Sequence, residues 1–248
     1  MTYPKIWGHR GASGYAPENT LEAFSLAVEM GADGVELDVQ LTKDEEIVVI
    51  HDETIDRVSN GKGWVKDYTL KELKTFNYNK THPEYEFVTI PTLKEVYTLL
   101  KDTELCINVE VKAGVICYKG IEEKILKLSD QMGMQDRVLY SSFNHYSIRR
   151  IQVLNTNAQI GLLYTQGLTN VVEYGIKMGV NAIHPSMDSL KCPGLINLCK
   201  QNSLQTHVWN VRDEDISYCC EMGVDAIITN YPDRTARIIN EYAGLTKQ

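Results

Sequence analysis

The sequence has no long hydrophobic run. No segment of its 248 residues approaches the roughly 18 consecutive apolar residues that a membrane-spanning helix needs. The N-terminal stretch MTYPKIWGHRGASGYAPENT also lacks the basic region, apolar core and small-residue cleavage site of a signal peptide. We therefore expect a cytoplasmic protein with no stable membrane association.

The sequence also lacks paired cysteine motifs and an excess of basic residues. Its six cysteines stand at irregular spacings without a C-x-x-C pair, which predicts reduced thiols and no disulfide framework. Lysine and arginine number 25 against 33 aspartates and glutamates, so the formal net charge is −8. This charge argues against nucleic acid as a partner. An anionic substrate would have to be held by a few local cations or by a metal ion.

Apolar, β-branched runs alternate with stretches of helical period along the whole chain. The predicted strands are Lys5–His9, Gly34–Gln40, Leu105–Lys112, Arg137–Phe143, Gln159–Tyr164, Asn181–Ser186, Gln205–Val211 and Asp225–Thr229. The predicted helices are Thr20–Met30, Gly120–Met132, Ser147–Asn155, Leu168–Met178, Cys192–Gln201 and Glu214–Glu221. Eight strands in a chain near the roughly 250 residues of a (β/α)8 barrel predict a single TIM-barrel domain over residues 1–248.

One apolar run breaks this alternation. Glu46–His51 follows the second strand after only four residues, too few for a parallel crossover, so it should fold back as an antiparallel hairpin. Pairing of Leu41 with Glu46 would set His51 opposite Glu36. Residues 52–103 then form a small insertion after the second strand, with a turn at Asn60–Gly63 and a short helix at Leu70–Phe76.

Two of the predicted strands carry carboxylates on one face. Residues two apart in a strand point the same way, so Glu36 lies beside Asp38, and Glu110 lies beside Asn108 and Lys112. Carboxylates inside a barrel are costly to bury unless something compensates them. Three of them on adjacent strands suit one divalent cation, Mg²⁺ or Ca²⁺, whereas the absence of H-E-x-x-H and of a Cys/His cluster disfavours zinc.

Further polar residues lie near strand ends. His9 and Arg10 close the first strand, and the hairpin returns His51 to the same region. Barrel active sites lie at the carboxyl ends of the strands, and two histidines beside a metal, an arginine and a lysine suit phosphoryl transfer. Taken singly, each residue has a structural alternative: an interior ion pair for the carboxylates and Lys112, a core position for His51, and a strand end for His9 and Arg10.

The segment after the first strand carries a helix-start signal. Asn19 is a favoured N-cap, and Glu22 stands three residues later, as in a capping box. Glu18 remains available to orient Arg10 or His9.

Short motifs follow one another in a specific order over nearly the whole chain. They are His9-Arg10-Gly11, PENT at 17–20, ELDVQLTKD at 36–44, His51-Asp52, Gly61-Lys62-Gly63, TLKEL at 69–73, EVK at 110–112, SSF at 141–143, VWNV at 208–211 and DAIITNYPD at 225–233. This series resembles the signature of the glycerophosphodiester phosphodiesterase family. The departures are conservative: Val111, Asn210 and Asn230 stand where the family often has isoleucine, threonine and aspartate.

The resemblance implies hydrolysis of glycerophosphodiesters to glycerol 3-phosphate and an alcohol, a step of lipid and glycerol metabolism. The family's positions map onto this chain as metal ligands Glu36, Asp38 and Glu110, acid/base histidines His9 and His51, and phosphate-binding Arg10 and Lys112. Glu18 is expected beside the substrate, and Phe143 and Trp209 either line the glycerol subsite or pack in the core.

Two other functions stay open at this point. A phospholipase that acts on intact lipid needs an exposed apolar or basic interfacial element, which the acidic sequence does not show. A barrel that binds a phosphodiester without cleaving it should have lost an acid/base or metal group, and all of these groups are present.

Overall fold

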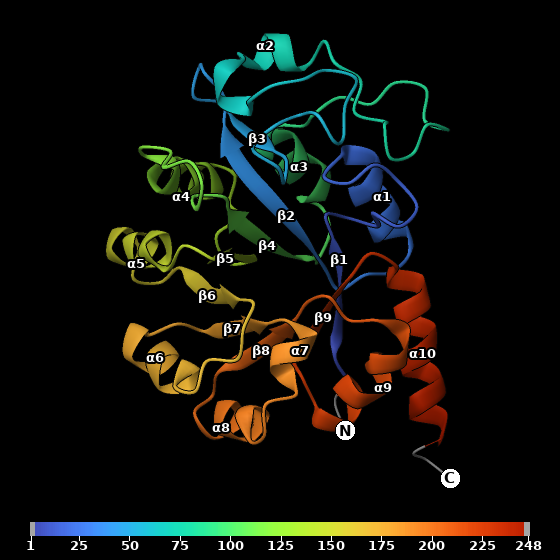
Figure 1. Cartoon of the computed structure of the whole chain (residues 1–248), viewed down its shortest axis with the longest axis vertical. Coiled ribbons are helices and arrows are strands. Elements are labelled where there is room, and N and C mark those ends of the chain that lie inside the picture. The colour runs from blue at the N-terminus through green and yellow to red at the C-terminus, as the bar shows by residue number, and fades with distance from the viewer. Residues whose placement is uncertain (1–2, 246–248) are drawn as a thin grey trace.

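Eight parallel strands close into a barrel, because β1 pairs with β2 on one side and with β9 on the other (Figure 1). The structure, a computed structural model, describes residues 3–245. The barrel strands are β1 (Lys5–His9), β2 (Gly34–Leu41), β4 (Cys106–Val111), β5 (Val138–Ser142), β6 (Gln159–Tyr164), β7 (Ala182–Pro185), β8 (Gln205–Val208) and β9 (Ala226–Thr229). The predicted TIM barrel is thereby confirmed.

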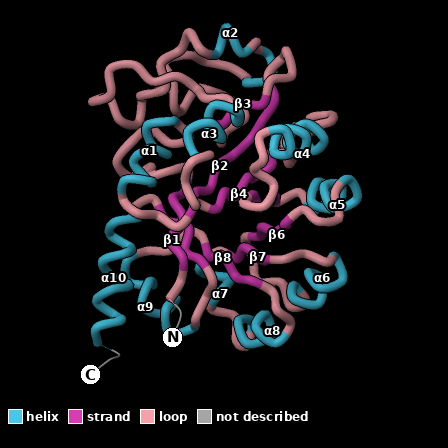
Figure 2. The backbone as a smooth tube through the Cα atoms, turned by 180° about the vertical axis from the view of Figure 1, so that it is seen from behind, coloured by secondary structure: helices cyan, strands magenta, loops and turns pink. Residues whose placement is uncertain are grey.

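Helices surround the strands as an outer ring (Figure 2). The longer ones are α1 (Leu21–Glu29), α3 (Leu93–Leu100), α4 (Ile121–Gln131), α5 (His145–Leu154), α6 (Val171–Met178), α8 (Leu195–Gln201), α9 (Asp213–Met222) and α10 (Pro232–Leu245). The predicted helices agree with these to within a few residues, while α3, α10 and the short α7 (Met187–Leu190) were not predicted. The main hydrophobic core lies between strands and helices, where outward-facing Val35, Leu37 and Val39 are buried.

The strand β3 (Ile47–Val49) lies outside the barrel and pairs antiparallel with β2, as the short connection requires. The predicted register is wrong by one residue, because Leu41 pairs with Ile47 and not with Glu46. The cause is the turn: Thr42 donates its backbone N–H to the carbonyl of Glu46, and Glu45 adopts a left-handed φ of 64°. Pairing ends at Val49, so His51 lies beyond the ladder and does not face Glu36 across it.

The residues after β3 build a small layer at one edge of the barrel. It contains the turn η1 (Val65–Asp67) and the helix α2 (Leu70–Leu73), and it has its own apolar cluster that includes Ile55, Tyr78 and Ile90. The helix α3 falls within the predicted insertion but packs in the main core, where Leu93 and Tyr97 are fully buried. The barrel alternation therefore resumes at α3.

The start of α1 differs from the prediction. Thr20 is the N-cap, and its hydroxyl accepts the N–H of Ala23 at 3.2 Å. Asn19 precedes the cap with a left-handed φ of 59°, which turns its amide away from the helix. The prediction of Asn19 as the N-cap with Glu22 is therefore wrong, and the Asn19 side chain is free for another role.

Among the described residues, no helix combines the length and apolar character that crossing a bilayer requires.

Candidate active site

Three buried carboxylates meet inside the barrel at the carboxyl ends of β2 and β4. In the register of these strands Asp38 pairs with Glu110, and Glu36 pairs with Asn108. Oxygen atoms of Glu36, Asp38 and Glu110 all lie within 4.8 Å of one another. The alternation of each strand thus produces the predicted carboxylate cluster.

The electrostatics of this cluster fit a cation. Burial and the charges of Asp38 and Glu110 raise the pKa of Glu36 well above its usual range. Burial and Asp38 likewise raise the pKa of Glu110, whereas Asp38 has its pKa lowered to about 2 because Arg10 and Lys112 outweigh its burial. Among the described residues, Oδ1 of Asp38 has no hydrogen-bond partner. A divalent cation prefers oxygen ligands of this kind and would stabilise all three carboxylates in their charged forms.

Two basic side chains border the carboxylates. Nε of Arg10 lies 3.4 Å from Asp38 Oδ2, and Nζ of Lys112 lies 2.9 Å from Glu110 Oε1 and 3.7 Å from Asp38 Oδ1. Arg10 adopts a left-handed φ of 55°, and its backbone N–H donates to Glu36 Oε2 at 3.0 Å. A non-glycine residue in this conformation carries about 1 kcal/mol of strain, which the bond to Glu36 helps to offset.

The ring of His9 lies against the same cluster. Its Nδ1 is 2.7 Å from Asn230 Oδ1, and its Nε2 is 3.9 Å from Glu36 Oε2. Burial and the nearby Arg10 charge lower the pKa of His9 to about 4. The neutral ring can therefore accept a proton at neutral pH.

His51 reaches the site although the hairpin register does not place it there. The amide nitrogen of Gln40 donates to the backbone carbonyls of Ile50, His51 and Asp52, at 3.1, 3.0 and 2.7 Å. Nδ1 of His51 lies 2.6 Å from Asp52 Oδ1. A carboxylate bonded to one ring nitrogen fixes the tautomer and leaves the other nitrogen for chemistry.

A chain of ion pairs connects Arg10 with Asp52, the residue that contacts His51. Glu18 accepts hydrogen bonds from Arg10 at 2.8 Å and from Arg57 at 2.6 and 2.8 Å. Arg57 also donates to Asp52 at 2.7 Å, and the bonds from Arg57 and His51 outweigh burial and lower the pKa of Asp52 to about 2. Glu18 thus orients Arg10, one of the two roles expected for it.

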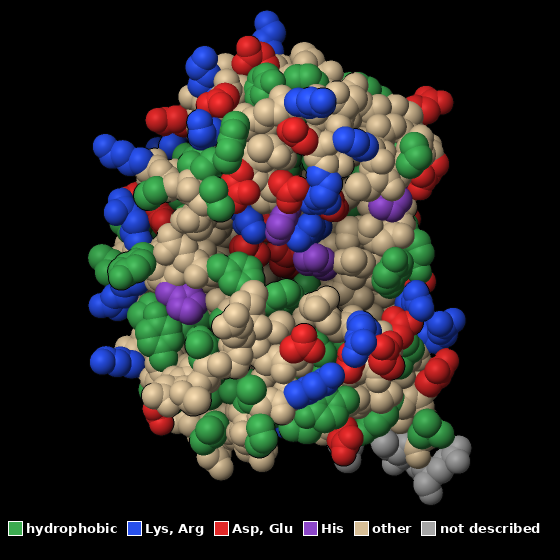
Figure 3. Space-filling view, in the orientation of Figure 1, with side chains coloured by type: hydrophobic (Ala, Val, Ile, Leu, Met, Phe, Trp, Pro, Cys, Tyr) green, Lys and Arg blue, Asp and Glu red, His purple; other side chains and the backbone are tan. Residues whose placement is uncertain are grey.

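A small cavity of about 80 Å³ opens onto the cluster. It is lined by His9, Arg10, Glu36, His51, Asn108, Glu110, Phe143, Leu163, Trp209 and Ile228. Figure 3 shows acidic, basic and histidine side chains gathered around a hollow near the middle of this face. The rings of Phe143 and Trp209 meet edge to face at 5.8 Å, and Phe143 is 43% exposed, so it lies at the rim and not in the core. A larger cavity, about 720 Å³, lies at the opposite end of the barrel, away from these groups.

The structure thus brings all ten predicted site residues together and adds others that were not predicted. Asn108 is 1% exposed and lines the cavity, and neither of its amide atoms has a hydrogen-bond partner within residues 3–245. Asn19, Gln40 and Arg57 hold Asp38, His51 and Glu18 in place. Alternation in the sequence did place Asn108 on the face of Glu110, although no role was predicted for it. It could also have indicated Gln40, which lies two residues after Asp38.

Comparison with known proteins identifies relatives over nearly the full length. The model of the glycerophosphoryl diester phosphodiesterase family matches residues 9–234. A glycerophosphodiester phosphodiesterase of Caldanaerobacter subterraneus subsp. tengcongensis is 43% identical over 238 residues, which are 95% of this chain and 98% of the relative.

Solved structures of related enzymes have the same fold. A glycerophosphodiester phosphodiesterase of Thermotoga maritima is 27% identical with a TM-score of 0.80, and the match covers 96% of this chain and 99% of that one. A phosphodiesterase of Oleispira antarctica, solved with its product sn-glycerol-3-phosphate, is 26% identical with a TM-score of 0.85 over 96% of this chain and 97% of that one. The predicted family and enzyme class are confirmed. The chain therefore belongs to the glycerophosphoryl diester phosphodiesterase family.

Proposed function

We propose that this enzyme hydrolyses glycerophosphodiesters to glycerol 3-phosphate and an alcohol, with a divalent cation as cofactor and two histidines as acid and base. The buried cluster of Glu36, Asp38 and Glu110 beside two histidines carries the proposal. The relative solved with sn-glycerol-3-phosphate supports the choice of substrate.

The carboxylates of Glu36, Asp38 and Glu110 would hold the cation, Mg²⁺ or Ca²⁺. When bound, such an ion neutralises phosphate oxygens and the charge that develops in the transition state. Arg10 and Lys112 bind further phosphate oxygens, since both charged groups border the cluster. The unpartnered amide of Asn108 offers another donor on the same wall.

We assign the general base to His9 and the general acid to His51. The lowered pKa of His9 keeps its ring neutral and able to take a proton from the attacking hydroxyl, which belongs to the glycerol or to water. The Asp52 carboxylate at 2.6 Å compensates positive charge on the His51 ring, as suits a group that donates a proton to the leaving alkoxide.

Phe143 and Trp209 form one wall of the cavity mouth and would contact the glycerol or the head group. The groups that bind phosphate do not distinguish head groups, so we expect comparable rates on glycerophosphocholine and glycerophosphoethanolamine. The cytoplasmic location and the absence of a nucleic-acid partner stay predictions.

The deciding experiment measures release of glycerol 3-phosphate from glycerophosphocholine by the purified protein. A chelator should abolish release, and Mg²⁺ or Ca²⁺ should restore it. Glu110→Gln should weaken metal binding measured by calorimetry, whereas Glu84→Gln at an exposed position should not. Full turnover in excess chelator would refute metal dependence, and the absence of glycerol 3-phosphate under all conditions would refute the substrate.

A further inference from the structure

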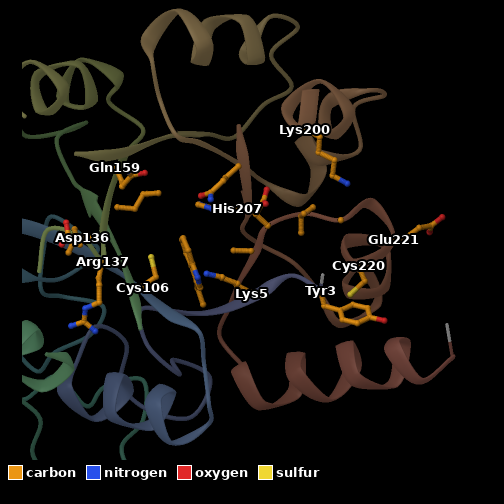
Figure 4. Close-up of a pocket in the computed structure, with 18 residues that line it drawn as sticks. Tyr3, Lys5, Cys106, Asp136, Arg137, Gln159, Lys200, His207, Cys220 and Glu221 are labelled. Atoms are coloured by element: carbon orange, nitrogen blue, oxygen red, sulfur yellow. The ribbon is translucent and has the colours of Figure 1, made fainter. Parts of the chain in front are cut away.

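A second cavity of about 720 Å³ opens at the amino ends of the barrel strands, at the opposite end from the catalytic residues (Figure 4). Lys5, Gln159 and Gln205 line it, and they are the first residues of β1, β6 and β8. Alternation points these side chains toward the barrel axis, on the same face as Trp7 and His207. All three side chains are exposed to solvent, so the cavity is the open lower mouth of the barrel.

The residues at this level are unusual for a barrel. Bulky Val, Ile and Leu side chains usually fill the interior layers. Here polar Lys5, Gln159 and Gln205 occupy inward positions, and Ala226 adds only a methyl group. Bulky apolar side chains therefore do not fill this level, although buried Leu139 also lines the cavity.

Two aromatic rings close the cavity toward the catalytic end. The rings of Trp7 and His207 lie 4.4 Å apart, and each residue is at most 3% exposed. Gly34 leaves the room that Trp7 needs, because a Cβ there would come within 2.7 Å of the indole ring. The rings of Trp7 and His207 therefore separate the lower cavity from the carboxylates of the proposed metal site.

The exposed side chain of Lys5 supplies a positive charge at the opening of the cavity. Among the described residues its ammonium has neither an ion pair nor a hydrogen bond, and Figure 4 shows it directed inward near Cys106 and His207. The ends of Arg137 and Glu221 point away from the centre in the same view. Burial raises the pKa of the Cys106 thiol and the Lys5 charge opposes that rise, which agrees with their proximity.

Several other charged groups around the cavity are engaged in hydrogen bonds within the protein, while the exposed carboxylate of Asp136 also lines it. Arg137 donates to the backbone carbonyls of Leu100 and Thr103, and Lys200 donates to that of Met222. Asp225 accepts the backbone N–H of Thr206 at 2.8 Å. By contrast, the side-chain amides of Gln159 and Gln205 make no hydrogen bond within residues 3–245, so two neutral donors remain beside one uncompensated cation.

We propose that this cavity is a second ligand site, which binds a small oxyanion, a phosphate or a carboxylate, with Lys5 as counter-ion and the Gln159 and Gln205 amides as donors. The site is independent of the hydrolytic function proposed above, since it shares no residue with the catalytic cavity. An oxyanion would pair with the Lys5 ammonium and accept from both amides, whereas a cation would be repelled by Lys5.

Cys106 provides a local reporter, because its partly exposed thiol lines the cavity. The rate of its modification by neutral iodoacetamide is measured by peptide mass spectrometry, with inorganic phosphate or malonate added at constant ionic strength. The exposed thiols of Cys117 and Cys192 are internal references. Phosphate at twice its Kd should slow Cys106 about threefold and leave the references unchanged. If phosphate protects Cys106 at a lower concentration than malonate, the site prefers phosphates, and the reverse order indicates carboxylates.

Variants of Lys5 test whether the anion that protects Cys106 binds in this cavity. Lys5→Met should abolish protection and Lys5→Arg should keep it, whereas Lys119→Met, at an exposed lysine outside the cavity, should behave as the parent. All three should retain hydrolysis of glycerophosphodiesters. Equal Cys106 rates with and without both anions would overturn the proposal. Protection that survives in Lys5→Met would also overturn it, since it would come from binding elsewhere.

Discussion

Nδ2 of Asn19 donates a 2.8 Å hydrogen bond to Oδ2 of Asp38, and both side chains are buried. The left-handed backbone of Asn19 turns its amide toward β2 and leaves the capping of α1 to Thr20. This bond fixes one carboxylate oxygen of Asp38. The other oxygen has no hydrogen-bond partner in the described part of the chain and remains available to a cation. Asn19 thus orients a proposed metal ligand.

Replacement of Asn19 by glycine should therefore weaken metal binding while the backbone conformation is kept, because glycine adopts a left-handed φ without strain. Loss of such an orienting bond typically reduces metal affinity about 10- to 100-fold. The dependence of activity on Mg²⁺ or Ca²⁺ concentration measures the change. Thr98→Gly, at an exposed helical position, is the control for a general loss of stability. An unchanged metal dependence in Asn19→Gly would remove Asn19 from the site.

Glu36→Gln should stabilise the metal-free protein. Burial and the charges of Asp38 and Glu110 raise the pKa of Glu36, so between its ordinary and its raised pKa the folded state binds more protons than the unfolded state. The stability of the metal-free parent therefore falls as pH rises through this window. The neutral side chain of the Glu36→Gln variant does not ionise, so the variant does not lose this stability. We therefore expect the metal-free variant to be more stable than the metal-free parent at neutral pH.

Urea unfolding in chelator across this pH range tests the prediction. The variant should also lose most of the stabilisation that metal gives the parent. A variant less stable than the parent at neutral pH without metal would contradict a raised pKa of Glu36 in the folded protein.

Asn230→Asp should shift the acidic limb of the pH–rate profile to higher pH. Oδ1 of Asn230 lies 2.7 Å from Nδ1 of His9. An aspartate there would hold a negative charge beside the ring and raise the pKa of His9 from about 4. A base must be neutral to accept a proton, so activity should fail at a higher pH than in the parent, by about one unit or more. The profile of kcat/KM measures this shift, and Asn202→Asp at an exposed position is the matched control. Superimposable acidic limbs would contradict the role of His9 as base.

His9 and His51 should both be needed for the chemical step, and each substitution by asparagine should reduce turnover about 10²- to 10⁴-fold. A nitrophenyl ester needs little protonation of its leaving group. His51→Asn should therefore recover much of its rate on this substrate, while His9→Asn should stay slow. His82→Asn, outside the cavity, is the control. Turnover of the metal-loaded variants within a few-fold of the parent would assign both histidines a purely structural role.

The sequence alone was sufficient for the barrel and for the residues that share a face of a strand. Alternation placed Glu36 with Asp38 and Glu110 with Lys112, because side-chain direction within a strand depends only on local backbone geometry. The number of strands predicted the barrel because each strand and each helix has its own hydrophobic periodicity in the sequence. The ordered motifs then indicated the family, since their spacing reflects the same repeats.

Only the tertiary structure decided how separate segments meet. The register of β3, wrong by one residue in the prediction, depends on the turn at Thr42 and Glu45, and His51 is positioned by Gln40 rather than by a strand partner. The sequence predicted Asn19 as a helix N-cap, but its side chain donates a hydrogen bond to Asp38. The left-handed backbone conformation of Asn19 in the loop before α1 directs the side chain there. Hydrogen bonds between residues far apart in the chain leave no periodic pattern in the sequence, so these positions became recognisable only once the barrel had brought them together.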